Sequence, residues 1–167
     1  LDTLCWTAVV LLTIRTLTRD EPSGWLLVGL VGGLGLENKH LMAFLLAAIA
    51  LGVALTPAVR HHLRAPAAWL GAGIALALWL PNLIWQATHD WPQLTLAGDI
   101  REEYLTLGER LGYAGLLLVL FSPLATPLWI YGLVRLLRAP TLVRARPIGW
   151  AFLILGAVFF VTGGKAY

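Results

Sequence analysis

The chain has 167 residues, of which 59% are hydrophobic and only 13% are charged. Soluble domains carry about 25% charged residues, so this composition argues against a soluble fold. The net charge of +3 comes mainly from two short loops between apolar segments, which favours a membrane protein over a nucleic-acid-binding one.

Six apolar segments, each a candidate membrane helix, alternate with charged loops. They cover about residues 3–17, 25–36, 41–55, 67–88, 111–134 and 147–162. The pattern predicts an all-α fold, a polytopic transmembrane helix bundle in which residues 1–167 form part of a single transmembrane domain. Pro123 and Pro127 lie inside the fifth segment and are expected to kink it. The chain starts without methionine and stops directly after an apolar segment, so we expect truncation at both ends.

The charges of the loops predict the orientation of the bundle. The loops at 56–66 and 135–146 contain arginines and no acidic residue, whereas the loop at 89–110 has five acids against two arginines. Short arginine-rich loops stay in the cytoplasm. The turn at 18–24 and the loops at 56–66 and 135–146 are therefore predicted to be cytoplasmic, and the acidic loop to lie outside.

Segments 25–36 and 41–55 form a predicted hairpin with Glu37-Asn38-Lys39-His40 at its tip. A helix of 12 residues spans about 18 Å, against roughly 30 Å of hydrocarbon, so the tip should lie below the outer surface, in a cavity that faces outward. Four glycines in the first segment of the hairpin should allow close packing on neighbouring helices: Gly29, Gly32, Gly33 and Gly35.

Ionisable residues at membrane depth usually mark a path for a substrate or an ion. Lys39 could offer a cation to an anionic headgroup, or it could extend to the interface and pair with Glu37. Asp2, on the same predicted side, could take part in that site or only cap its helix.

Two more residues on the outer side could carry chemistry. Lys165 is either an interfacial anchor or a second cation, and His89 is either part of an aromatic belt or a sugar contact. His61 and His62 lie among cytoplasmic arginines and are expected to be solvated. We find no metal-ligand spacing, phosphate-binding glycine loop or catalytic triad, so no cofactor is predicted.

Three stretches of the chain resemble a known family. They are GLGLENKH at 33–40, LPNLIWQATHDWP at 80–92 and GGKAY at 163–167. They are similar to segments of the polyprenyl-phosphate-dependent glycosyltransferases of the dolichyl-phosphate-mannose protein mannosyltransferase and aminoarabinose transferase superfamily (glycosyltransferase family 39, GT-C fold). Asp2 matches an aspartate that opens the corresponding helix. Asn38 and Gln86 depart from the usual threonine and asparagine.

The resemblance implies an inverting transfer of a sugar from a polyprenyl-phosphate donor to a lipid, glycan or protein acceptor. It implies an active face on the periplasmic side of the bacterial inner membrane and leaves a divalent metal open. Lys39 would stabilise the phosphate leaving group, with Asp2 as an organiser. The remaining substrate-binding candidates are Lys165, His89, His40, Glu37 and Tyr167. The general-base aspartate would precede residue 1, so this chain alone is expected to be inactive.

Two other functions fit parts of the pattern. A secondary transporter would explain a hairpin with charges at membrane depth, but it predicts an internal repeat that the sequence does not show. A non-catalytic membrane scaffold predicts no gathering of Asp2, Lys39 and Lys165 on one side.

Overall fold

The computed structural model describes residues 1–93 and 125–162, together with Gly108 and Gly112. The described residues are all-α, as predicted, with six α-helices and two short 3-10 turns. The helices are α1 (Asp2–Arg19), α2 (Gly24–Asn38), α3 (Leu41–Leu55), α4 (Pro66–Thr88), α7 (Thr126–Arg138) and α8 (Arg146–Thr162), and the turns are η1 (Arg60–Arg64) and η2 (Pro140–Leu142).

Two helices, α2 and α7, differ from their predicted bounds in ways that affect the interpretation. Helix α2 continues to Asn38, so only Lys39 and His40 separate it from α3. Helix α7 begins at Thr126 and places Pro127 in its first turn, where the missing N–H breaks no helical bond. The expected kink at Pro127 is therefore wrong, and Pro123 lies outside the described residues.

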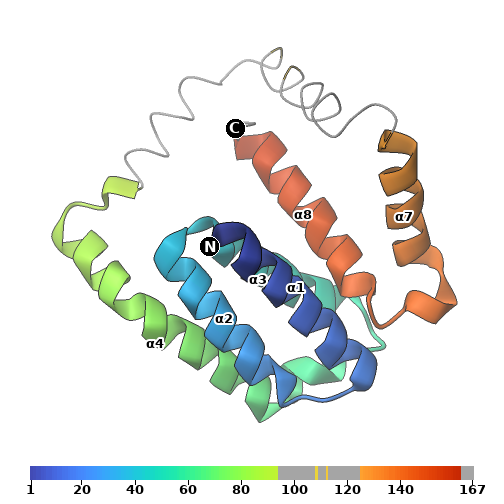
Figure 1. Ribbon diagram of the computed structural model, residues 1–167, viewed down its shortest axis with the longest axis horizontal. Coiled ribbons are helices and arrows are strands. Elements are labelled where there is room, and N and C mark those ends of the chain that lie inside the picture. Colours follow the sequence, from blue (N-terminus) through green and yellow to red (C-terminus); the bar gives the residue numbers. More distant parts are fainter. Residues whose placement is uncertain (94–107, 109–111, 113–124, 163–167) are drawn as a thin grey trace.

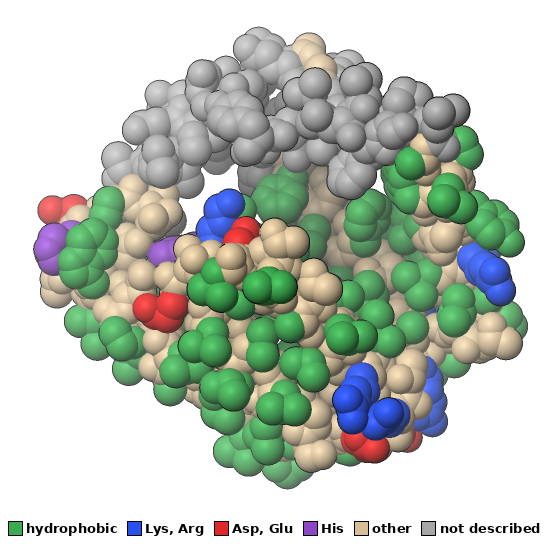
Figure 2. Space-filling view, viewed as in Figure 1, with side chains coloured by type: hydrophobic (Ala, Val, Ile, Leu, Met, Phe, Trp, Pro, Cys, Tyr) green, Lys and Arg blue, Asp and Glu red, His purple; other side chains and the backbone are tan. Residues whose placement is uncertain are grey.

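Helix α4 is the one described helix that is long and apolar enough to cross a bilayer. Only 11% of its most apolar window is buried against the rest of the described chain, unlike the core helix of a soluble protein. Leu41–Leu55 and Arg146–Val161 are also apolar but shorter. Many large apolar side chains are exposed on the surface, and Figure 2 shows hydrophobic side chains spread over the described part of the visible face.

The helices run between two ends of the molecule (Figure 1). Helix α2 packs against α1 and α4, α3 packs against α8, and α7 contacts α8. At one end, called the tip end, lie the start of α1, the Lys39–His40 tip and the last residues of α4 and α8. At the opposite end, called the arginine end, lie the turn after α1, η1 and the connection between α7 and α8.

Glycines bring α2 and α4 into backbone contact. A methyl group at Gly29 would collide with the carbonyl of Gly71, and one at Gly71 would collide with the carbonyl of Trp25. Gly33 faces Leu78 and the backbone of Ala75 in the same way. The predicted role of Gly29 and Gly33 in close helix packing is confirmed. These contacts fix the position of the tip along the axis of α4.

Candidate functional site

The tip is a two-residue interruption between two apolar helices. Lys39 has extended backbone (φ −155°, ψ 122°), and its N–H donates to the carbonyl of Gly35 at 2.8 Å. His40 precedes the first residue of α3, and its carbonyl accepts a hydrogen bond from the N–H of Ala43 at 3.0 Å. The side chains of Lys39 and His40 therefore project from a fixed point where α2 ends and α3 begins.

Lys39 pairs with Asp2. The Nζ atom of Lys39 lies 3.7 Å from Oδ2 of Asp2, which stands in the first turn of α1, and the two side chains are 58% and 36% exposed. A pair this exposed contributes only about 0–1 kcal/mol to stability. The alternative pairing of Lys39 with Glu37 is not the one observed, and Glu37 is exposed in the last turn of α2.

The other oxygen of Asp2 has no partner among the residues that the structure describes. Its Oδ1 atom is buried and accepts no hydrogen bond from the described residues. Buried polar atoms are paired in most proteins, and the exceptions often occur where function requires them. Asp2 therefore has one carboxylate oxygen beside a lysine and one that is buried without a donor among the described residues.

His40 is held from two sides. Its Nε2 atom lies 3.1 Å from Nε2 of Gln86, and its ring stands edge-on to Trp79 at 5.7 Å and 89°. Gln86 is only 3% exposed, and its Oε1 accepts a hydrogen bond from the N–H of Gln93 at 3.4 Å. Sequence reasoning treated Gln86 only as a departure from the family pattern. A buried amide in an apolar helix needs a hydrogen-bond partner, so the presence of a glutamine in this apolar segment could have marked Gln86 as a functional candidate.

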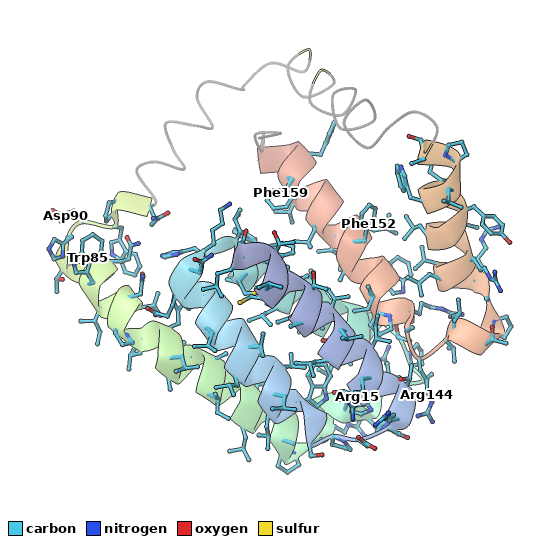
Figure 3. All side chains as sticks on the ribbon, viewed as in Figure 1. Arg15, Trp85, Asp90, Arg144, Phe152 and Phe159 are labelled. Carbon is cyan, nitrogen blue, oxygen red and sulfur yellow. The ribbon has the colours of Figure 1, made fainter. Side chains whose placement is uncertain are left out.

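His89 belongs to a different group. Its ring stacks on Trp85 at 4.4 Å and 19°, and its Nδ1 lies 2.8 Å from the carbonyl of Trp85 and 3.0 Å from Oγ1 of Thr88. Figure 3 shows Trp85 and Asp90 at the end of α4, on the edge of the molecule. Among the described residues the partners of His89 lie in its own helix, so the structure does not join it to Lys39. Lys165 and Tyr167 lie outside the described residues, as does most of the loop predicted at 89–110.

An apolar cavity of about 350 Å³ lies between α2, α3 and α4. Trp25, Leu63 and Trp69 line it toward the arginine end, and Trp79 lines it toward the tip end. Because Trp79 also touches His40, the cavity reaches the residues that hold the tip. The arrangement offers an apolar space with polar groups at one end.

Asp20 gathers three basic groups at the arginine end. Its Oδ1 lies 2.9 Å from Nε2 of His61 and 3.0 Å from Nε2 of His62, and its Oδ2 lies 3.2 Å from Nη1 of Arg144. The hydrogen bond from His61, together with the positive charge of Arg144, holds the pKa of Asp20 below its ordinary value. Figure 2 shows basic side chains gathered at this end, and Figure 3 labels Arg15 and Arg144 in this part of the molecule.

His62 is fully buried, so the expectation that it is solvated is wrong. The reason is a partner that is distant in the sequence, because the indole N–H of Trp25 donates to Nδ1 of His62 at 3.2 Å. Burial lowers the pKa of His62, and the neighbouring ring of His61 lowers it further, although Asp20 acts in the opposite direction. His61 is exposed, as expected.

The ligand atoms of Asp20, His61 and His62 lie within 4.8 Å of one another, which is close enough for one metal ion. The hydrogen bonds do not fit that use. Because Trp25 donates to Nδ1 of His62, the proton of the neutral ring is on Nε2, which lies 3.0 Å from Oδ1 of Asp20 without hydrogen-bond geometry and has no free lone pair for a metal. A metal-bound histidine needs a free lone pair on the binding nitrogen and an acceptor for the other N–H. The group therefore joins the turn after α1 to η1 and to the start of α8.

One family model matches this chain. The model of the dolichyl-phosphate-mannose-protein mannosyltransferases covers residues 1–85 of 167, which include Asp2, the tip and most of α4. The chain belongs to this family. Members of this glycosyltransferase lineage are membrane-bound and use polyprenyl-phosphate sugar donors. No curated protein and no solved structure gives a significant match.

Proposed function

We propose that this mannosyltransferase-family chain forms the donor-phosphate side of an integral-membrane inverting glycosyltransferase. The reaction moves a sugar from a polyprenyl phosphate to a lipid, glycan or protein acceptor on the periplasmic face of the bacterial inner membrane. The observation that carries the proposal is the Lys39–Asp2 pair, at the end of the bundle where the apolar cavity meets the tip.

The chemistry requires a cation beside the leaving group. The acceptor oxygen attacks the anomeric carbon while its proton passes to a general base, and the bond from that carbon to the phosphate oxygen breaks. The electron pair stays on the lipid phosphate, whose negative charge grows in the transition state. The ammonium group of Lys39 is 58% exposed and hence accessible to that phosphate, and a fixed cation there lowers the barrier.

Asp2 has two roles in this proposal. Its Oδ2 lies 3.7 Å from Nζ of Lys39, so Asp2 orients that cation and through it organises the donor. A carboxylate next to the lysine also reduces the net charge of the empty site, so the site does not hold the released phosphate too tightly. Asp2 is therefore an organiser in this account and not the general base.

The apolar cavity suits the hydrocarbon part of the same donor. It is lined mainly by aromatic and aliphatic side chains, which match an isoprenoid chain better than a polar ligand. With the chain in the cavity, the phosphate would stand near His40 and Lys39 at the tip end. Glu37 and His40 are proposed as further donor contacts, and Lys165, Tyr167 and His89 stay proposals from the family resemblance.

The proposed topology is polytopic. The arginine end is cytoplasmic and the tip end faces outward, because the loops at 56–66 and 135–146 contain arginines and no acid. Helix α4 is long enough to span, whereas α2 and α3, with 15 residues each, reach only about 22 Å. The tip therefore ends inside the membrane boundary, where a lipid phosphate can approach it from the outer leaflet.

Reconstitution of the full-length protein tests the proposal. The purified protein is placed in liposomes with a polyprenyl phosphate that carries a radiolabelled sugar and with a mixture of membrane-derived acceptors. We expect the label to move to an acceptor while free polyprenyl phosphate appears in equal amount. Label that crosses the bilayer with the sugar–phosphate bond intact would instead identify a transporter. Absence of both transfer and transport would favour the scaffold and contradict the proposal.

A further inference from the structure

We propose that Gln86 is a positioning residue for the transfer reaction, holding the Lys39–His40 tip in place and linking it to the segment after α4. The inference rests on the proposed function for its effect on catalysis. The mechanical link itself stands on the contacts of Gln86, a residue that lies just beyond the family-matched residues 1–85.

The burial of Gln86 requires both of its hydrogen bonds. The side chain is 3% exposed within a largely apolar helix, and a buried amide without partners is costly. Its carbonyl accepts from the N–H of Gln93 at 3.4 Å, so its NH₂ group is the one that faces Nε2 of His40 at 3.1 Å. Reversing the amide would set NH₂ against the N–H of Gln93. The orientation of Gln86 therefore makes Nε2 of His40 an acceptor and leaves the ring proton on Nδ1.

Gln86 is also the point where the chain turns after α4. Its backbone carbonyl accepts the N–H groups of His89 at 3.2 Å and Trp91 at 3.0 Å. Asp90 and Trp91 have positive φ angles of 58° and 53°, a conformation that costs free energy in residues other than glycine. The backbone of Gln86 thus holds the turn after α4, and its side chain holds the tip.

The tip depends on such a support because it is only two residues long. Lys39 is exposed, and its ion pair with Asp2 can orient the ammonium group but is too weak to hold the backbone of the tip in place. His40 is its direct neighbour, and the described side-chain partners of His40 are Gln86 and Trp79. Loss of the Gln86 contact would loosen the tip, and a misplacement of a reacting group by about 1 Å can cost about 100-fold in rate.

The first experiment is a kinetic cycle on the full-length protein. Gln86→Leu removes both hydrogen bonds at similar volume, and His40→Leu removes the same contact from the other side. We expect each to lower kcat by roughly 10- to 100-fold, because the position of Lys39 matters most as charge develops, and we expect Gln86→Leu, which removes no proposed donor contact, to change KM for the donor little. The double variant should be no slower than the slower single variant. Rate losses that multiply in the double variant would overturn the link.

A matched control lies one turn earlier in the same helix. Asn82 is also an amide, but its Oδ1 is buried without a hydrogen-bond partner in the described residues. Asn82→Leu makes the same chemical change and leaves the tip untouched, so kcat should stay within about twofold of wild type. A loss equal to that of Gln86→Leu would show that any polar residue of α4 has this effect and would contradict a positioning role.

A second measurement does not depend on activity. A spin label on Glu37→Cys reports the mobility of the tip by electron paramagnetic resonance. We expect the label to become more mobile when Gln86→Leu or His40→Leu is added. Its mobility should stay unchanged when Asn82→Leu is added. Unchanged spectra in both tip variants would overturn the positioning proposal even if transfer is observed. Increased mobility in a protein that transfers no sugar would instead support the link and contradict the proposed function.

Discussion

Replacing Gly71 by alanine is expected to destabilise the protein, whereas the same replacement at Gly73, two residues along α4, is not. A methyl group at Gly71 would collide with the backbone carbonyl of Trp25 in α2, and one at Gly73 would meet no described atom within 4 Å. Both positions lie inside the same helix, so the two variants share the change in helix propensity and differ in packing.

The magnitude follows from two opposing effects. Alanine is better than glycine in a helix interior by about 1 kcal/mol, which both variants gain. At Gly71 the collision is with backbone, so α2 and α4 must separate, and overpacking of this kind costs about 1–3 kcal/mol. We therefore expect Gly73→Ala to be neutral or stabilising, and Gly71→Ala to be less stable than Gly73→Ala by about 1–3 kcal/mol.

Thermal unfolding of the purified protein in detergent measures this difference. For domains of this size 1 kcal/mol corresponds to about 2–4 °C, so the two melting temperatures should differ by several degrees. Gly29→Ala, which meets the Gly71 carbonyl from the other helix, should behave like Gly71→Ala. Equal melting temperatures for Gly71→Ala and Gly73→Ala would refute the close contact of α2 and α4. They would also remove the support for placing the tip next to Gln86 along α4.

Two further predictions concern the arginine end and the orientation. The lowered pKa of His62 means that the unfolded chain binds more protons as the pH falls through about 6.5, so acidification should destabilise the protein. His62→Gln offers a side-chain carbonyl to the indole N–H of Trp25 and does not titrate. The fall in melting temperature between about pH 7.5 and 5.5 should therefore be smaller in this variant, and an unchanged slope would contradict the role of His62. For orientation, a membrane-impermeant maleimide should label Asp90→Cys in intact cells and Arg64→Cys only after lysis. The reverse pattern would overturn the proposed topology.

The helices could be predicted from the sequence because apolar length and charged interruptions dominate in this chain. The predicted bounds of α3 match the structure, since Lys39-His40 on one side and Thr56-Pro57 on the other interrupt its apolar run. The error at Pro127 has a local cause. A proline inside an apolar run can kink a helix or begin one, and the sequence alone does not separate these outcomes.

Side-chain partners were harder to predict because they depend on which helix faces meet. Alternating topology places Asp2 and Lys39 at one end of the bundle, and the structure brings them to 3.7 Å, although their role in transfer stays a prediction. Topology does not reveal which face of α4 meets the tip, so sequence reasoning chose His89 and passed over Gln86. The burial of His62 was missed for the same reason, since it depends on contact with Trp25 in another helix.

The central claim is that Lys39 supplies the cation for the lipid-phosphate leaving group. The most direct test compares Lys39→Ala with Arg64→Ala, which removes one exposed cation from the arginine end. Both are assayed in the full-length protein for transfer of labelled sugar from a polyprenyl phosphate, with membrane insertion and melting temperature as controls. The account predicts that Lys39→Ala loses about 100-fold or more in kcat and that Arg64→Ala retains activity. Near-normal turnover of Lys39→Ala would contradict the account.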